Sequence, residues 1–153
     1  MKKILLWLED RPTEIVDLIQ KAEEKFDTVY VRRNPISIKK KLEELGGQKD
    51  VRICGIVIDI MIPHIENFGA MGKPYIKTPG GYDAGLEFVR HILLEDETWK
   101  KIPICFLTNI MEHRVQELVE RYQLPSALII EKHIGRWEKS LLDWFDTILN
   151  KTR

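Results

Sequence analysis

The chain has 153 residues, enough to bury a core, and we expect a single domain over 1–153. Lys plus Arg and Asp plus Glu number 24 each, so the net charge indicates neither nucleic acid nor a membrane surface as a partner. No apolar run approaches the roughly 20 residues that cross a bilayer, and Cys54 and Cys105 each lie in an apolar run, which favours a reducing, cytoplasmic setting.

Five short apolar runs are typical of strands. The clearest is Ile53-Cys54-Gly55-Ile56-Val57-Ile58, whose β-branched side chains predict a strand buried on both faces of a parallel sheet. Asp59 ends this run, and Pro63 prevents a regular strand or helix from continuing smoothly past it. We expect strands over 2–8, 27–31, 53–59, 102–107 and 127–130.

The segments between these strands show helical spacing of apolar residues. Pro12 suits the first helical position, and Gly46-Gly47 stops the second helix. The expected helices cover 12–26, 35–45, 82–94, 111–122 and 134–149, the last with Ile134, Trp137, Leu141, Phe145 and Ile148 facing inward. By contrast 64–81 has no clear period and is rich in Gly and Pro, which predicts a long loop, functional or mobile.

Strands that alternate with helices predict an α/β fold with a doubly wound, five-stranded parallel sheet. Right-handed crossovers place helices on both faces, most economically in the flavodoxin-like strand order 2-1-3-4-5. The carboxyl ends of parallel strands lie at one edge of such a sheet, where ligands bind. The polar groups at the ends of the predicted strands therefore meet there.

Those polar groups are three carboxylates, a hydroxyl and an ammonium: Glu9, Asp10, Asp59, Thr108 and Lys132. Clustered carboxylates raise one another's pKa values unless a cation lies among them, and oxygen ligands with open positions suit Mg²⁺. A carboxylate can attack phosphorus and form an acyl phosphate, whose charge a metal and Lys132 would neutralise while Thr108 donates a hydrogen bond. Taken singly, Asp59 could instead cap a turn and Lys132 could be an ordinary solvated lysine.

Over nearly its full length the chain resembles the response-regulator receiver domain. The matching pieces are Leu8-Glu9-Asp10, Asp59-Ile60-Met61-Ile62-Pro63, Gly85-Leu86-Glu87-Phe88, Leu107-Thr108 and Ala127 to Lys132, in the family's order. The resemblance implies that Glu9 and Asp10 bind Mg²⁺, with the Met61 backbone carbonyl as a further ligand. It also implies that Asp59 is the phosphoacceptor and a metal ligand, Thr108 the switch hydroxyl, and Lys132 the lysine that contacts the phosphoryl group.

Three positions depart from the family's pattern. His133 stands where the family usually has a proline in a cis linkage, and Ile129 stands at the position of the aromatic switch residue. The segment 64–81 is an insertion where the family has a short turn. These departures would suit an atypical receiver whose insertion covers the site, excludes phosphodonors or binds a partner.

The resemblance implies a chemotaxis-type, stand-alone response regulator rather than an enzyme, apart from catalysing its own phosphorylation and dephosphorylation. A histidine kinase or phosphotransfer protein would supply the phosphoryl group, and a downstream protein would receive the signal. A homodimer through the fourth and fifth strands and helices would also fit. Two alternatives stay open: a phosphorylation-independent pseudo-receiver that binds proteins, and an aspartyl-nucleophile phosphohydrolase. The latter normally has a second acid where this chain has Met61.

Overall fold

The computed structural model describes residues 1–109, 112–122 and 128–150. Its main sheet has five parallel strands in the order β2-β1-β3-β6-β7, which is the predicted order 2-1-3-4-5 when only these strands are numbered. The strands are β1 (Lys2–Leu8), β2 (Thr28–Arg32), β3 (Val51–Asp59), β6 (Ile104–Thr108) and β7 (Leu128–Glu131). The predicted doubly wound, flavodoxin-like α/β fold is confirmed.

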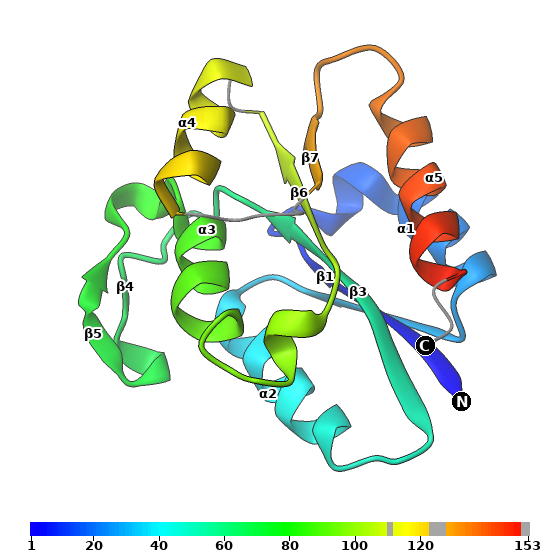
Figure 1. Cartoon of the computed structure of the whole chain (residues 1–153). Helices are drawn as coiled ribbons and strands as arrows, with labels where there is room; N and C mark the ends of the chain where they lie inside the picture. Colours follow the sequence, from blue (N-terminus) through cyan, green and yellow to red (C-terminus); the bar gives the residue numbers. More distant parts are fainter. Residues whose placement is uncertain (110–111, 123–127, 151–153) are drawn as a thin grey trace.

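Helices cover both faces of this sheet (Figure 1). On one face lie α1 (Val16–Lys25), which follows a 3₁₀ turn at Pro12–Ile15, and α5 (Trp137–Leu149). On the other face lie α2 (Pro35–Gly46), α3 (Ala84–Phe88) and α4 (Glu112–Tyr122). The helices thus cover the faces and leave the carboxyl edge of the sheet to the loops.

Each face of the sheet has its own apolar core. Under α1 and α5, Trp7 and Phe26 meet the ring of Phe145 edge-on, with centroids 6.0 and 5.4 Å from it. The β1 and β3 side chains that point to the opposite face of the sheet form the second core, under α2 and α3. Burial on both faces explains why the strands read as continuous apolar runs.

The segment after β3 is not the irregular loop that its sequence predicts. β4 (Asn67–Phe68) and β5 (Lys73–Lys77) form a small antiparallel hairpin, flanked by 3₁₀ turns at Gly69–Met71 and Pro79–Gly81. Its residues Phe68 and Ile76 are buried in the α2–α3 core, and Lys73 Nζ donates to the carbonyl oxygen of His91 (2.8 Å). The prediction failed because so few apolar residues anchor the hairpin that they set up no period.

Two predicted helices differ from those observed. The 82–94 segment is a short α-helix, α3, continued by a π-helical stretch at Val89–Leu93. The last helix begins at Trp137 rather than at 134, because Gly135 has φ +46° and interrupts the chain before it. Ile134 is therefore 52% exposed and does not face inward as predicted. The predicted ends at Met111 and Ala127 lie outside the described residues.

A 3₁₀ turn at Trp99–Lys101 precedes β6. In the described part of the chain, each helix is too short or too polar to cross a membrane.

Candidate functional site

The carboxyl ends of four strands bring the predicted polar residues together. Parallel pairing sets Leu8 beside Ile58, Asp59 beside Leu107 and Thr108 beside Glu131, so the side chains that follow these pairs share one edge. They line a single cleft of about 530 Å³. Its lining comprises Glu9, Asp10, Arg11, Glu14, Asp59, Met61, Pro63, Tyr82, Thr108, Asn109, His113 and Lys132.

Three carboxylates form the floor of the cleft. Glu9, Asp10 and Asp59 each offer an oxygen, and these oxygens lie within 4.8 Å of one another. Glu9 is 2% and Asp59 7% exposed. Burial, followed by the charge of Glu9, raises the pKa of Asp59 to about 8, against the opposing effect of Lys132. The like-charge effect predicted from sequence is thus present, although burial is the larger cause.

This donor set fits a hard divalent cation. The three converging groups are all carboxylates, and a bound cation would offset the burial and the like charge that disfavour ionisation of Asp59. Met61 lines the same cleft, and the direction of its backbone carbonyl toward a metal stays a prediction. The cluster is consistent with divalent-metal binding.

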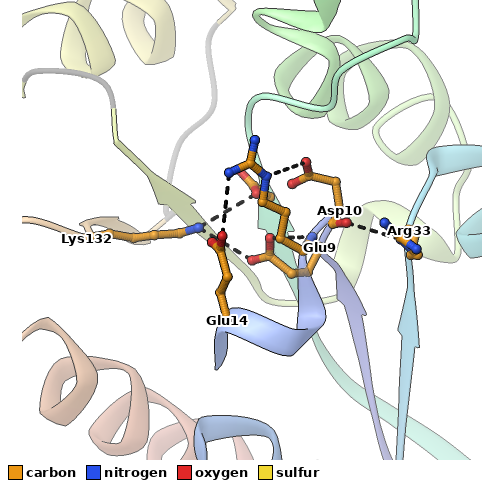
Figure 2. A network of polar contacts seen from close by, with 7 residues as sticks. Glu9, Asp10, Glu14, Arg33 and Lys132 are labelled. Atoms are coloured by element: carbon orange, nitrogen blue, oxygen red, sulfur yellow. Dashed lines mark hydrogen bonds and ion pairs between the residues drawn. The ribbon is translucent and has the colours of Figure 1, made fainter. Parts of the chain in front are cut away.

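Lys132 reaches this acidic floor from the end of β7 (Figure 2). Its Nζ lies 3.4 Å from Glu9 Oε1 and 3.7 Å from Asp59 Oδ2, and its side chain is mostly buried. The Lys132 amide donates to the carbonyl oxygen of Thr108 (2.8 Å), which fixes where the side chain departs. No peptide bond among the described residues is cis. The ammonium therefore reaches the carboxylates although His133 replaces the usual proline.

Two arginines that sequence reasoning missed contact the acidic pair. The Arg11 amide donates to Glu9 Oε2 (3.1 Å), and the Arg11 guanidinium lies 3.8 Å from Asp10 Oδ2. Arg33, beyond the end of β2, donates from Nε to the carbonyl oxygen of Asp10 (3.1 Å; Figure 2). Arg11 adjoins the pair in sequence and could have been noticed, whereas Arg33 comes close only through the pairing of β1 with β2.

Two glycines allow the next segments to pack against the end of β3. The Gly85 amide donates to the Ile60 carbonyl (2.8 Å), and a Cβ on Gly85 would lie only 2.3 Å from the carbonyl oxygen of Asp59. Gly81, with φ +70°, accepts from the Ile62 amide (3.0 Å). Backbone contact at both points holds the chain that leaves Asp59, which positions the carboxylate.

Of the remaining positions singled out in the sequence, Thr108 lines this cleft and Ile129 lines a different cavity. Thr108 is buried at the end of β6. Ile129 is half-buried and packs against the core under α2 and α3, and His133 is exposed. An aliphatic side chain therefore occupies the position where the family has a ring.

No family model and no curated protein matches the chain, but solved structures do. The Mn²⁺-bound form of response regulator Rcp1 is 16% identical with a TM-score of 0.63, over 100% of this chain and 98% of that one. The phosphorylated cyanobacterial phytochrome response regulator RcpA is 17% identical with a TM-score of 0.63, over 99% and 96%. The Vibrio cholerae chemotaxis protein CheY4 is 16% identical with a TM-score of 0.60, over 97% and 98%. The chain therefore has the fold of the response-regulator receiver domain, as its sequence predicts.

Proposed function

We propose that the chain is a response-regulator receiver that accepts a phosphoryl group on Asp59 in a Mg²⁺-dependent reaction. The observation that carries this proposal is the cleft itself, where the Asp59 carboxylate lies among Glu9, Asp10 and the Lys132 ammonium. Receiver-fold neighbours described as phosphorylated and as Mn²⁺-bound support it. The proposed setting is the cytoplasm, which suits the two free, buried cysteines.

The proposed chemistry is an in-line displacement at phosphorus. An Asp59 carboxylate oxygen attacks the phosphorus of a phosphohistidine on a histidine kinase or phosphotransfer protein, the P–N bond breaks, and the imidazole leaves. Lys132 Nζ, which lies 3.7 Å from Asp59 Oδ2, would neutralise a phosphoryl oxygen. The Thr108 hydroxyl would turn toward another. A bound Mg²⁺, held by Glu9, Asp10, Asp59 and the Met61 carbonyl, supplies further charge neutralisation.

In this proposal the chain is a phosphoacceptor and not an enzyme acting on other molecules, although its residues would assist its own phosphorylation and dephosphorylation. The signal would pass to a partner protein. A phosphohydrolase is not favoured, because Met61 occupies the position of the second acid and its apolar side chain is 47% exposed.

A pseudo-receiver that binds its partner without phosphate is the second candidate. The observation that favours it is Ile129, whose half-buried aliphatic side chain packs against the core and has no ring to reorient. The two candidates are separated by measuring partner binding before and after treatment with a phosphodonor, for the wild-type chain and for Asp59→Asn. Equal binding before and after phosphorylation would favour the pseudo-receiver.

The test of the leading proposal is the intact mass of the chain after incubation with acetyl phosphate, with and without Mg²⁺. We expect one phosphoryl adduct that requires Mg²⁺ and is absent from Asp59→Asn. Asp83→Asn, which changes an aspartate that is not among the residues of the cleft, is the matched control and should keep the adduct. A folded wild-type chain that binds Mg²⁺ yet accepts no phosphoryl group from acetyl phosphate or from a histidine kinase would contradict the proposal.

A further inference from the structure

Part of the lining of the acidic cleft is apolar, and it comes from both ends of the 64–81 insertion. Met61 and Pro63, which precede the insertion, and Tyr82, which follows it, all line the cleft. Met61 is 47% exposed, and Pro63 and Tyr82 are half-buried. Neutralising the charge of a phosphoryl group needs only polar groups and a metal, so this apolar lining calls for a further explanation.

A hydrogen-bonded neck at the base of the insertion places Tyr82 near Pro63. The Ile62 amide donates to the Gly81 carbonyl oxygen (3.0 Å), and a Cβ on Gly81 would lie 3.1 Å from the Pro63 Cα. The Gly81 amide in turn donates to the carbonyl oxygen of the fully buried Thr78 (2.7 Å). Beyond this neck the β4–β5 hairpin is anchored in the α2–α3 core. The fold of the insertion therefore brings Tyr82 to the cleft beside Pro63.

We propose that the ring of Tyr82 receives the imidazole of the phosphodonor, and that Tyr82 thereby sets a preference for phosphohistidine over acyl phosphates. The inference rests on the proposed function, because the donor must deliver its phosphoryl group to Asp59. The cleft has a volume of about 530 Å³, which is typical of pockets that hold a small organic molecule. A donor ring therefore fits in the cleft together with the phosphoryl group it carries.

The charge of the donor ring supplies the selectivity. A phosphohistidine ring that is protonated at its second nitrogen is a flat cation, which the face of an aromatic ring attracts. When an Asp59 oxygen forms its bond to phosphorus, the P–N bond breaks, its electron pair stays on the ring nitrogen, and neutral imidazole leaves. Acetyl phosphate has neither a ring nor a positive charge, so it gains no such attraction. Tyr82 therefore discriminates between donors by their leaving groups.

The test compares two small phosphodonors, phosphoimidazole and acetyl phosphate, on the full chain in saturating Mg²⁺. Intact mass gives a second-order rate constant for each donor, and the readout is their ratio, because a general loss of structure lowers both constants. We expect Tyr82→Leu to lower the ratio of phosphoimidazole to acetyl phosphate about three- to tenfold, the effect of losing one cation–π contact. Tyr82→Phe keeps the ring face and should keep the ratio. Tyr75→Leu is the matched control, since Tyr75 belongs to the same insertion, is 71% exposed and is not among the residues of the cleft.

Three results would overturn this inference. They are an unchanged ratio in Tyr82→Leu, a fall in Tyr82→Phe as large as that in Tyr82→Leu, or an equal fall in Tyr75→Leu. Each of them leaves the proposed function standing, because both donors still phosphorylate the chain. A wild-type chain that neither donor nor a histidine kinase phosphorylates would instead contradict the proposed function, and this inference with it.

Discussion

Asp59 lines the acidic cleft and Glu131 lines a second cavity, beside β7, and the surroundings of these two almost fully buried carboxylates differ. Asp59 is 7% exposed and Glu131 8% exposed. Asp59 lies among two other carboxylates and the Lys132 ammonium, whereas Glu131 accepts no hydrogen bond from the described residues and has mainly apolar neighbours among them. Equal burial therefore does not mean equal chemistry. A cluster of like charges suits a compact divalent cation.

The largest effect is expected on the rate of phosphorylation, when the Lys132 ammonium is removed from the acidic cleft. Lys132→Met should slow phosphorylation by acetyl phosphate by roughly 10²- to 10³-fold, the effect of removing one group that stabilises developing charge. The rate can be followed by intact mass in saturating Mg²⁺. Lys139→Met, which removes an exposed lysine from α5, should react at the wild-type rate. A Lys132→Met rate within about threefold of wild type would show that Lys132 does not contact the phosphoryl group.

The second prediction concerns the stability of the metal-free chain as a function of pH. The pKa of Asp59 is raised from 3.8 to about 8, so the folded state holds a proton that the unfolded state releases between these values. Stability should therefore fall as pH rises from about 4 to about 8. Asp59→Asn removes this loss and should be more stable than wild type above pH 8, by an amount on the order of a few kcal/mol.

Urea unfolding in EDTA across this pH range checks the second prediction. The advantage of Asp59→Asn should shrink toward pH 4 and, at neutral pH, after addition of Mg²⁺ to the wild-type chain. An advantage that does not change with pH would mean that the Asp59 carboxylate is not the group responsible.

The third prediction tests the other buried carboxylate. Glu131→Leu should raise the free energy of unfolding by about 1–3 kcal/mol, because it removes a desolvated group that accepts no hydrogen bond within the described part of the chain. Thermal or urea unfolding measures this change. Glu138→Leu, at an exposed position in the first turn of α5, should cause no gain and at most a small loss. If Glu131→Leu destabilised the chain, Glu131 would have a partner in solution.

The smallest effect is expected at Arg11, because exposure weakens its ion pair. Its side chain is 66% exposed and lies 3.8 Å from Asp10 Oδ2. Arg11→Ala should change the free energy of unfolding by no more than about 1 kcal/mol and leave the phosphorylation rate within about threefold. A loss of phosphorylation rate as large as that in Lys132→Met would contradict this prediction. It would show that the exposed Arg11 side chain contributes as much to the reaction as the mostly buried Lys132 side chain.

The sequence predicted the strand order and the acidic cleft because both depend on local patterns. Continuous β-branched runs mark strands buried on both faces, and the residue that ends each strand is carried to one edge by parallel pairing. Glu9, Asp10, Asp59, Thr108 and Lys132 were all found in this way, and they line one cleft. Their roles in metal binding and phosphoryl transfer stay predictions.

The features that sequence reasoning missed depend on contacts between distant segments. The Asn67–Lys77 hairpin is anchored in the core by Phe68 and Ile76, which are too few to show alternation. Arg33 comes close to Asp10 only through strand pairing. In the sequence Glu131 is one more polar residue at the end of a strand, and only the structure shows that its carboxylate is buried without a hydrogen-bond partner among residues 1–109, 112–122 and 128–150.

The measurement that tests the central claim most directly is to locate the phosphoryl group. After treatment with acetyl phosphate and Mg²⁺, borohydride reduces an acyl phosphate to an alcohol, and peptide mass spectrometry identifies the reduced residue. We predict homoserine at position 59 and unmodified carboxyl groups at Glu9 and Asp10, as the resemblance to the receiver domain implies. Reduction at Glu9 or Asp10, or a phosphoryl group carried on a histidine, would contradict this account.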